Sequence, residues 1–424
     1  MTDTSKNVLK SWINYSTDCD FSLQNLPFGV CRTSSGSSHL VSAIGEYVID
    51  LAALNKLGYF SAFAIHQSVF ENNYLNDFIA LGKGITSKLR LTLMDLFGKG
   101  NSALALNQEH QSMVLFKRVE VELLLPLKIS NYTDFYSSIE HATNVGTMFR
   151  DPKNALLPNW KHIPIGYHGR ASSICVSGTN FHRPKGQTKA TDAELPTFGP
   201  STMLDFELEM AFVVGKETQL GECLAIDATN DYIFGLMLFN DWSARDMQTW
   251  EYVPLGPFLA KNFASTVAPW VVTLEALEPF RVAQPQQEPA VLPYLKSTIE
   301  MPNIDIHLQV AIQTPTGAEK VVSNSNFKYM YWSMNQQLAH HSSNGCNLQI
   351  GDLYASGTIS GPTEDSYGSM LELSWRGTKP IAMPDGSERK FILDNDTVIM
   401  RGYCSKDGIR VGFGEAKAKV LPAT

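Results

Sequence analysis

The segment from residue 204 to residue 214 alternates acidic and apolar residues, and this alternation constrains the fold more than any other part of the sequence. Successive side chains of a β-strand point to opposite faces of its sheet, so the pattern predicts a strand whose apolar side chains enter a core. The acidic side chains then share the other face of the strand. These acidic residues are Asp205, Glu207 and Glu209.

Two of these acidic residues predict one half of a metal site. Neighbours on one face of a strand lie about 6.7 Å apart, so Glu207 and Glu209 can both lean onto one hard cation at about 2.3–2.6 Å. Without a cation, the two carboxylates would repel each other on a half-buried strand. Because metal ions supply catalytic chemistry in many enzymes, the motif makes the chain a candidate enzyme.

Two further carboxylates can complete such a site. Asp241 directly follows the continuous apolar run at 232–239, which predicts a strand buried on both faces. Asp241 is either a metal ligand at the end of that strand or the N-cap of a helix, and the sequence leaves both open. Asp134, in a polar segment at 131–141, can supply a fourth oxygen. Four carboxylates without a Cys/His cluster favour Ca²⁺ or Mg²⁺ over Zn²⁺.

Other polar residues are candidates for catalysis, and each also has an ordinary structural explanation. His141 is a candidate general base because imidazole titrates near neutral pH, although a single histidine is more often structural. Glu372, in a strand predicted over 370–375, can orient a histidine or face solvent. The pair His340–His341 near a predicted helix end is interpreted as structural. The candidate donors to an oxyanion, which can equally be exposed polar side chains, are Arg245, Gln248, Tyr252 and Lys261.

A chain of 424 residues exceeds the size at which a single core stops growing, so we expect two domains. A hairpin at 40–51 predicts a small β-structured opening domain, and apolar residues at helical spacing predict that 53–97 is mainly helical. A strand predicted at 119–126 connects the two parts. We therefore expect an N-terminal domain over 1–118 and a second domain over 119–424.

The second domain is expected to contain many short strands between Gly/Pro turns. One helix is predicted in it, with Asn326 as its cap and Gly345 as its end. The segment 281–303 is rich in Pro and Gln and is expected to be a surface excursion.

The composition argues against several classes of protein. The net charge is −8 and the pI about 5.7, so neither nucleic acid nor an anionic membrane is expected as a partner. No apolar run is long enough for a membrane span, and the polar start at Met1–Lys6 does not resemble a signal peptide. The six scattered cysteines predict free thiols and a cytoplasmic location. The sequence contains no Gly-x-Ser-x-Gly motif for a serine hydrolase.

Eight ordered motifs carry a resemblance to a known family. On these motifs the chain resembles the fumarylacetoacetase (fumarylacetoacetate hydrolase) family, over nearly all of 119–424 and more loosely before it, chiefly at 24–30. The motifs lie at 132–138, 141–146, 154–160, 166–173, 208–212, 240–246, 250–259 and 355–361.

The resemblance implies a fold and an activity. The implied fold is mostly β (α+β), with a small SH3-like N-terminal β-barrel domain and a large C-terminal domain that forms a mixed β-sandwich roll and assembles as a homodimer. The implied activity is the metal-dependent hydrolysis of a carbon–carbon bond of 4-fumarylacetoacetate, a dicarboxylic 1,3-diketone. The products are fumarate and acetoacetate, in the last step of tyrosine and phenylalanine catabolism.

The resemblance also implies roles for individual residues. His141 would be the general base, oriented by Glu372, and Lys261 with Ser265 would contact a second, structural cation. The catalytic Ca²⁺ or Mg²⁺ would be held by Asp134, Glu207, Glu209 and Asp241. The oxyanion would be stabilised by Arg245, Gln248 and Lys261. The substrate would contact Tyr136, Arg150, Gln248, Tyr252 and Thr358.

The chain departs from the family pattern near the second cation. Ala260 stands where Gly is expected before Lys261, and Ala264–Ser265 stands where Gly-Thr is expected. The hydroxyl of Ser265 keeps one contact to that cation, while the added methyl groups alter the loop.

Three alternative functions are weighed. An acylpyruvate hydrolase or an oxaloacetate decarboxylase of the same superfamily would use a similar set of carboxylates. A non-catalytic ligand-binding scaffold would not need both His141 and Glu372. A carboxylate–metal nuclease is disfavoured because the chain is acidic and has no basic stripe.

Overall fold

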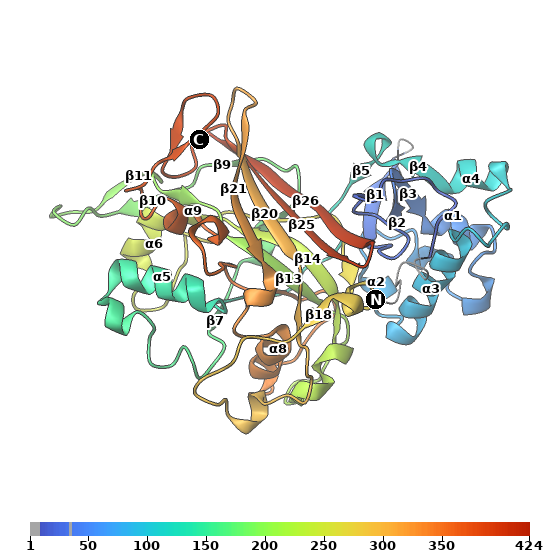
Figure 1. Cartoon of the computed structure of the whole chain (residues 1–424), viewed down its shortest axis with the longest axis horizontal. Coiled ribbons are helices and arrows are strands. Elements are labelled where there is room, and N and C mark those ends of the chain that lie inside the picture. Colours follow the sequence, from blue (N-terminus) through green and yellow to red (C-terminus); the bar gives the residue numbers. More distant parts are fainter. Residues whose placement is uncertain (1–8, 34–35) are drawn as a thin grey trace.

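The computed structural model describes residues 9–33 and 36–424, and the predicted polar start at Met1–Lys6 lies outside them. Figure 1 shows a smaller N-terminal part on the right and a larger part, rich in sheet, on the left. This confirms the predicted fold class, a sheet-rich α+β chain with a small N-terminal β domain. No helix in the described ranges has both the length and the apolar character needed to cross a membrane.

The N-terminal sheet is antiparallel throughout and contains the predicted hairpin. Ile44 lies opposite Tyr47, so Gly45 and Glu46 form the expected two-residue turn, in which Gly45 adopts a φ of +57°. The order of its strands is β4 (Leu115–Lys117), β3 (Tyr47–Asp50), β2 (Ser38–Ile44), β1 (Phe28–Arg32) and β5 (Glu122–Leu123).

Helices cover part of this sheet and confirm part of the prediction for 53–97. The longest, α3 (Lys83–Leu96), buries Leu89, Leu93 and Leu96 at helical spacing. Gly82 separates α3 from α2 and has a φ of +80°. The helical segment is therefore broken at a backbone conformation that glycine adopts more easily than other residues. The other helices of this part are α1 (Leu51–Lys56), α2 (Asn76–Ile79) and α4 (Gln108–Val114).

The larger part contains a central sheet that positions the candidate site. Its pairs are antiparallel except β22 with β6 and β16 with β8. The order of its strands is β7 (Gly166–His168), β6 (Tyr132–Phe135), β22 (Leu353–Ala355), β13 (Leu208–Val214), β14 (Ile233–Asp241), β16 (Ser265–Val267) and β8 (Ile174–Val176), and β17 (Val272–Thr273) also pairs with β14.

A second sheet packs against one face of the central sheet. The shared core confirms that the apolar residues of the 204–214 run, such as Leu208 and Met210, point inward against strands that include β20 and β25. The order of the second sheet is β21 (Glu319–Asn326), β20 (His307–Gln313), β25 (Thr397–Lys406), β26 (Ile409–Leu421) and β9 (Phe181–His182).

The opposite face of the central sheet is covered by the N-terminal part. Ala211 and Val213 of β13, with Met237 and Phe239 of β14, share one core with the N-terminal helices and strands. Glu209 lies on this same face, since it is two residues from Ala211. The candidate metal ligands therefore sit where the N-terminal core ends along the sheet.

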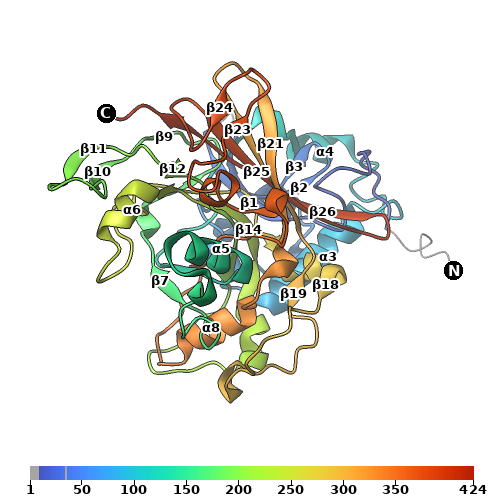
Figure 2. The ribbon, with the colours of Figure 1, turned by 60° about the vertical axis from the view of Figure 1, so that its left-hand side comes forward.

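The remaining pairs of strands and helices lie around these sheets. In Figures 1 and 2 the β10–β11 hairpin extends away from the body beside α6. The short strand pairs are β10 (Lys185–Thr188) with β11 (Thr197–Pro200), β12 (Leu204–Asp205) with β15 (Ser243–Ala244), β18 (Arg281–Val282) with β19 (Asn303–Ile304), and β23 (Ile381–Ala382) with β24 (Glu388–Arg389). The helices are α5 (Ile139–Phe149), α6 (Arg245–Glu251), α7 (Leu274–Leu277), α8 (Met334–Ser342) and α9 (Met370–Leu373).

The predicted strand at 370–375 is wrong, because Met370–Leu373 form the short helix α9. The hydroxyl of Ser369 accepts a hydrogen bond from the backbone N–H of Glu372, which caps the helix. A run as short as Met-Leu-Glu-Leu-Ser fits both periods, and the cap selects the helical one.

The helix predicted to begin at Asn326 begins later. Asn326 caps a short 3₁₀ turn over Phe327–Tyr329, and α8 starts only after Ser333, whose hydroxyl and Gln336 form a capping box. Of the apolar residues at four-residue spacing in this segment, Met330 follows the 3₁₀ turn, and only Met334 and Leu338 lie in α8.

The predicted connecting strand at 119–126 is shorter than expected. Only Glu122–Leu123 pairs, as β5, and it extends the N-terminal sheet beside β1. The division at residue 118 stays a prediction. All six cysteines are free thiols, and two of them, Cys31 and Cys404, are buried.

Candidate metal centre and active site

Four carboxylates from separate strands converge at one place in the central sheet. Their ligand oxygens all lie within 4.8 Å of one another, and the four side chains are buried. Asp134 is on β6, Glu207 lies between β12 and β13, Glu209 is on β13, and Asp241 ends β14. The structure thus brings together the four residues that the sequence nominated as oxygen ligands of one cation.

The register of the sheet explains this convergence. Leu208 pairs with Asn240, so Glu207 and Glu209 lie beside the end of β14, where Asp241 stands. On the other side of β13, β22 pairs in parallel with β6 and places Asp134 opposite Ala355. Residues far apart in sequence therefore meet at the same level of neighbouring strands.

The interpretation of Asp241 as a helix N-cap is wrong. Helix α6 begins four residues later, after Ala244, and has no side-chain cap. The carboxylate of Asp241 instead accepts hydrogen bonds from the hydroxyl groups of Tyr167 at 3.0 Å and Ser265 at 3.1 Å.

Two basic residues partly neutralise the cluster. The ammonium group of Lys261 contacts Glu207 and lies 2.7 Å from Asp241. A guanidinium nitrogen of Arg245 lies 2.8 Å from Glu207. Burial alone would raise the pKa of Glu207, but Lys261 and Arg245 outweigh burial and hold that pKa below its usual range. Glu207 is therefore ionised between two cations.

The other carboxylates remain undercompensated. Burial, followed by the repulsion of neighbouring carboxylates, raises the pKa of Asp134 and of Glu209 well above the usual range. Asp134 Oδ1 and Glu209 Oε1 have no hydrogen-bond partner among the described residues, although both are buried. Buried oxygens without a donor are costly, and a divalent cation between them would satisfy both, so the donor set fits a hard metal ion.

A histidine–glutamate pair lies beside the four carboxylates. His141, on α5, places its Nδ1 atom 2.7 Å from Oε2 of Glu372. This contact leaves Nε2 of His141 as the atom that can take a proton. The backbone of Glu207 pairs with that of Ser369, whose hydroxyl donates to Glu372, so the histidine–glutamate pair and the cluster are neighbours. The aromatic ring of Tyr136 lies edge-on to the imidazole, with ring centroids 5.4 Å apart.

Glu372 is held by several donors, and the alternative that it faces solvent is wrong because it is buried on α9. Burial would raise the pKa of Glu372, but His141 and the hydrogen bonds to its carboxylate outweigh burial and lower the pKa. The other donors to this carboxylate are Asn144 at 2.9 Å, Ser360 at 2.9 and 3.0 Å, and Ser369 at 2.8 Å.

The remaining predicted site residues differ in their contacts and in their exposure to solvent. Gln248 accepts a hydrogen bond from Arg245 at 3.2 Å, and Thr358 is buried. Arg150 is exposed after α5 and donates to the carbonyl of Ala155. Tyr252 follows α6 and is 53% exposed. Among the described residues, neither Arg150 nor Tyr252 forms a hydrogen bond or ion pair with the four carboxylates, so their substrate roles stay predictions.

The second cation also stays a prediction. Within residues 9–33 and 36–424, the four carboxylates are the one group of acidic, histidine and cysteine side chains arranged to hold a metal. The hydroxyl of Ser265 donates to Asp241, and both Ala260 and Ala264 are buried.

Sequence reasoning missed two contributors. Tyr167 donates to Asp241, and nothing in its short motif singles out this tyrosine. Asp205 was expected to share the face of Glu207 and Glu209, but its carboxylate turns to Arg245 and α9. The reason is that the strand is interrupted after Asp205, where β12 ends, before β13 begins at Leu208.

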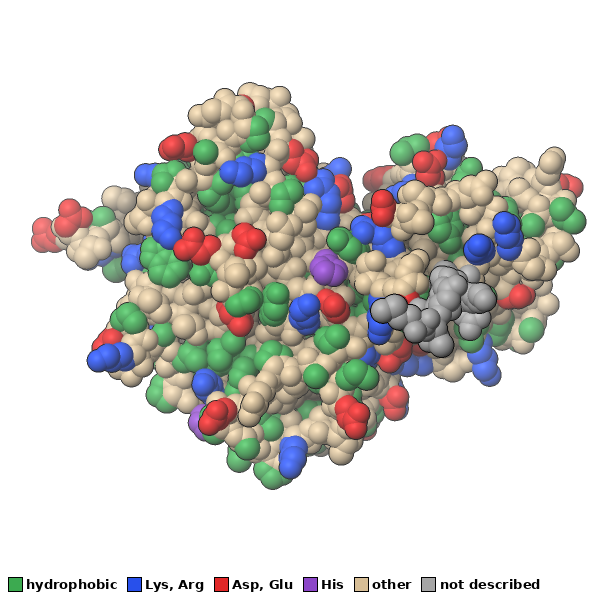
Figure 3. Space-filling view, viewed as in Figure 1, with side chains coloured by type: hydrophobic (Ala, Val, Ile, Leu, Met, Phe, Trp, Pro, Cys, Tyr) green, Lys and Arg blue, Asp and Glu red, His purple; other side chains and the backbone are tan. Residues whose placement is uncertain are grey.

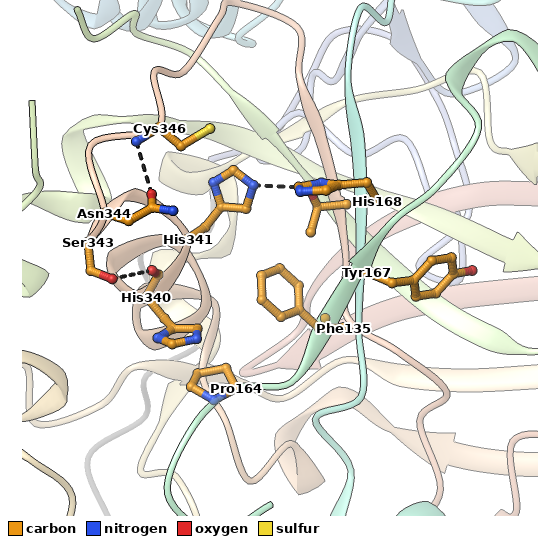
Figure 4. Close-up of a pocket in the computed structure, with 11 residues that line it drawn as sticks. Phe135, Pro164, Tyr167, His168, His340, His341, Ser343, Asn344 and Cys346 are labelled. Carbon is orange, nitrogen blue, oxygen red and sulfur yellow. Dashed lines mark hydrogen bonds between the residues drawn. The ribbon is translucent and has the colours of Figure 1, made fainter. Parts of the chain in front are cut away.

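A separate pocket of about 360 Å³ lies against β6 and β7. Figure 4 shows His340 and His341 on one side of it, and the hydroxyl of Tyr167 pointing away from them. Burial, then His168 and His340, lower the pKa of His341 to about 4. Its Nδ1 atom lies 3.0 Å from the hydroxyl of Tyr354, consistent with the structural interpretation of this pair.

Two family models cover the chain. The model described as fumarylacetoacetate (FAA) hydrolase, C-terminal, matches residues 130–420, and the model described as fumarylacetoacetase, N-terminal, matches residues 24–126. The chain belongs to the fumarylacetoacetate hydrolase family.

Curated relatives within the fumarylacetoacetate hydrolase family match nearly the whole chain. The fumarylacetoacetase of Dictyostelium discoideum is 51% identical over 423 residues, which cover 98% of this chain and 99% of that protein. The fumarylacetoacetase of Caenorhabditis elegans is 52% identical, covering 98% of this chain and 100% of the relative. The fumarylacetoacetase of Homo sapiens is 50% identical, covering 97% and 99%.

A solved structure supports the fold of the fumarylacetoacetate hydrolase family in this chain. A fumarylacetoacetate hydrolase from psychrophilic Exiguobacterium antarcticum aligns with a TM-score of 0.51 at 16% identity, covering 94% of this chain and 99% of the other. At this identity the likeness concerns the fold alone.

Proposed function

We propose that this chain is a fumarylacetoacetase, which hydrolyses a carbon–carbon bond of 4-fumarylacetoacetate to give fumarate and acetoacetate. This is the last step of tyrosine and phenylalanine catabolism. The observation that carries the proposal is an identity of about 50% to curated fumarylacetoacetases over nearly the full chain. The His141–Glu372 pair beside four buried carboxylates supplies the chemistry that such a hydrolysis needs.

The proposed cofactor is Ca²⁺ or Mg²⁺, held by Asp134, Glu207, Glu209 and Asp241. The four side chains offer oxygen atoms only, which is the donor set that these hard cations prefer. When bound, such a cation polarises carbonyl oxygens and holds a 1,3-dicarbonyl in place as a Lewis acid.

His141 is proposed to activate water. Because Nδ1 of His141 is engaged by Glu372, its Nε2 atom takes the proton of a water molecule, and the hydroxide adds to the carbonyl carbon on the fumaryl side. Glu372 is ionised and buried, so it stabilises the imidazolium that forms and fixes the direction of the ring.

Arg245 and Lys261, with Gln248, are proposed to stabilise the oxyanion formed by this addition. Burial alone would lower the pKa of Lys261, but the carboxylates of Asp241 and Glu207 outweigh burial and raise that pKa, so the side chain stays charged. One such donor typically contributes about 2.7–4 kcal/mol to the stabilisation of a transition state. The carbon–carbon bond then breaks, the electron pair leaves with the acetoacetate part, and a proton completes that product.

The remaining site roles follow from this substrate. Its two carboxylates are proposed to meet Arg150 and Tyr136, and Tyr252 and Thr358 are proposed to contact its chain. Burial, followed by the charges of Glu372 and Glu207, raises the pKa of the Tyr136 hydroxyl, and the guanidinium group of Arg150 opposes this rise. A second cation near Lys261 and Ser265 belongs to the same proposal.

A homodimer is proposed through an exposed apolar surface on and after α6. Leu255 is 98% exposed and Phe258 68%, and Phe198 on the neighbouring β11 is 73% exposed. Trp250 joins the two segments by donating to Gln187 of β10 at 3.3 Å. A surface of this kind on a free chain suits an interface with a second copy. Sedimentation velocity would test it, since a Leu255→Asp/Phe258→Asp variant is expected to be monomeric.

The cytoplasm is the proposed location, since the cysteines are all free thiols. On the face drawn in Figure 3, acidic and basic side chains are interspersed, which is in keeping with a small-molecule substrate.

The decisive experiment follows the absorbance of 4-fumarylacetoacetate and identifies the products, with EDTA and with Ca²⁺ or Mg²⁺ restored. We expect fumarate and acetoacetate to form in equal amounts, and EDTA to stop the reaction reversibly. A panel with an acylpyruvate and oxaloacetate separates the alternatives within the superfamily. Binding of 4-fumarylacetoacetate without turnover would instead support a ligand-binding scaffold.

A further inference from the structure

Asp205 is a buried carboxylate that joins two parts of the candidate site without belonging to the metal cluster. It is fully buried at the end of β12. One of its oxygens, Oδ2, accepts a hydrogen bond from Nε of Arg245 at 2.7 Å and from the backbone N–H of Leu371 at 3.1 Å. The other, Oδ1, accepts from the N–H of Met370 at 2.6 Å.

On one side, Asp205 fixes the guanidinium group of Arg245. The Nε edge of Arg245 is held by Asp205, while the other nitrogens reach Glu207 at 2.8 Å and Gln248 at 3.2 Å. A planar guanidinium held at two edges by carboxylates has little freedom to rotate. The position of Arg245 toward the reacting oxygen is therefore set in part by Asp205.

On the other side, Asp205 fixes the helix that carries Glu372. Helix α9 spans only Met370–Leu373, and a single helical turn has little stability by itself. Its first N–H groups lack partners within the helix, and Asp205 accepts those of Met370 and Leu371. The carboxylate also suits the positive end of the helix.

The position of Glu372 then sets the position of the imidazole. Glu372 is the third residue of α9, and its Oε2 atom lies 2.7 Å from Nδ1 of His141. A shift or fraying of this turn moves the Glu372 carboxylate and, with it, the ring of His141. The chain of contacts from Arg245 through Asp205 to α9 and His141 is continuous and buried.

We propose that Asp205 is a positioning residue that locks Arg245 and the His141–Glu372 pair into one arrangement. Asp205 touches neither substrate nor cation in this role, and it acts through the two groups that it holds. The inference rests on the proposed function for its effect on catalysis, while its structural part concerns the hydrogen bond between His141 and Glu372 and can be measured without substrate.

The chain offers a matched control in Asp396. Asp396 is also fully buried, accepts from Arg389 at 2.7 and 2.8 Å, and accepts from the backbone N–H of Leu393 at 2.9 Å. It has the same chemistry as Asp205 but contacts neither Arg245 nor α9. Asp205→Asn and Asp396→Asn therefore both weaken a buried ion pair, and only the first is expected to disturb the site.

The test compares the two variants in the full-length, metal-loaded protein. For Asp205→Asn we expect kcat to fall about 100-fold, the usual scale for a misplaced catalytic group, with KM within about threefold of wild type. For Asp396→Asn we expect kcat to stay within about threefold of wild type. The melting temperature is expected to fall in both variants, because each weakens a buried ion pair. In a double variant with Glu372→Gln, the loss in kcat should be smaller than the product of the two single losses, because only the part of the Asp205 effect that acts through Arg245 is still available to add.

A second measurement makes the inference independent of turnover. The Nδ1–H proton of His141, shared with Glu372, should give a far-downfield proton resonance that Glu372→Gln removes. We expect Asp205→Asn to broaden or remove it and Asp396→Asn to leave it. An unchanged resonance in Asp205→Asn, a kcat loss matched by Asp396→Asn, or independent losses in the double variant would each overturn the inference. If wild type fails to turn over the substrate, the proposed function fails, and the resonance still decides the role of Asp205.

Discussion

His141 and Glu372 are 231 residues apart in the sequence, and their side chains lie 2.7 Å apart in the folded protein. His141 stands on α5 and Glu372 on α9, so the pair exists only because two short helices meet beside the central sheet. Both side chains are buried, which makes the hydrogen bond between them well shielded from water.

His141→Ala is expected to abolish turnover, with a loss in kcat of at least about 100-fold. The bound cation is expected to stay in place. The reason is that His141 is not among the four oxygen donors. The ratio of cation to protein, measured by elemental analysis, should remain that of wild type. A variant that loses its cation together with its activity would show that the imidazole also supports the metal.

Glu209→Gln is expected to weaken cation affinity by at least about tenfold, since one negative charge and one ligand oxygen are altered. Glu209 Oε1 has no hydrogen-bond partner among the described residues, so the substitution breaks no bond at that atom. Isothermal titration with Ca²⁺ and Mg²⁺ measures the change. Equal affinities for the variant and wild type would exclude Glu209 as a ligand.

Tyr167→Phe is expected to reduce cation affinity by roughly tenfold while leaving the fold intact. The hydroxyl of Tyr167 donates to Asp241 at 3.0 Å, and its loss frees the carboxylate to rotate. The same titration applies. The control is Tyr354→Phe, whose hydroxyl contacts His341 rather than a carboxylate of the cluster and should not change the affinity.

Cation binding is expected to release protons and to strengthen as pH rises. Burial and neighbouring carboxylates raise the pKa of Asp134 and Glu209, so these two side chains hold more protons in the folded, cation-free chain than in the unfolded chain. The contribution of these two side chains to stability therefore falls as pH rises above the ordinary carboxyl range of about 4. A cation removes this loss, so the rise in melting temperature on adding Ca²⁺ should be larger at pH 8 than at pH 5.

Titrations in two buffers with different ionisation enthalpies check the proton release directly. The observed heat of cation binding should differ between the buffers in proportion to the protons released. If the heat of cation binding is the same in both buffers, and the rise in melting temperature is the same at both pH values, the predicted release of protons is contradicted.

Leu89→Ala is expected to destabilise the protein by about 2–5 kcal/mol, because it opens a cavity in the core shared by α3 and the central sheet. Leu91→Ala on the same helix is the control, since Leu91 is 59% exposed and should change stability by less than about 0.5 kcal/mol. Urea denaturation followed by circular dichroism measures both. Equal effects of the two substitutions would contradict the assignment of the buried face of α3.

The sequence indicated the parts of the fold in which local pattern and final environment agree. The hairpin around Gly45 and Glu46 needs only a turn that suits its residues, and the buried run that became β14 fits a strand in any context. The α9 helix was missed because four residues carry too little periodicity, and two of its first N–H groups are accepted by Asp205, which lies 165 residues before Met370.

By itself, the sequence determined which chemical groups are available. Its alternation of acidic and apolar residues predicts that Glu207 and Glu209 lie on the same face of a strand, and its motifs indicate the family. Only the tertiary structure decided which of these groups meet. It brought Asp134 and Asp241 to Glu207 and Glu209, and it turned Asp205 away to Arg245, since strand register and a break after β12 act between distant segments and leave no trace in local spacing.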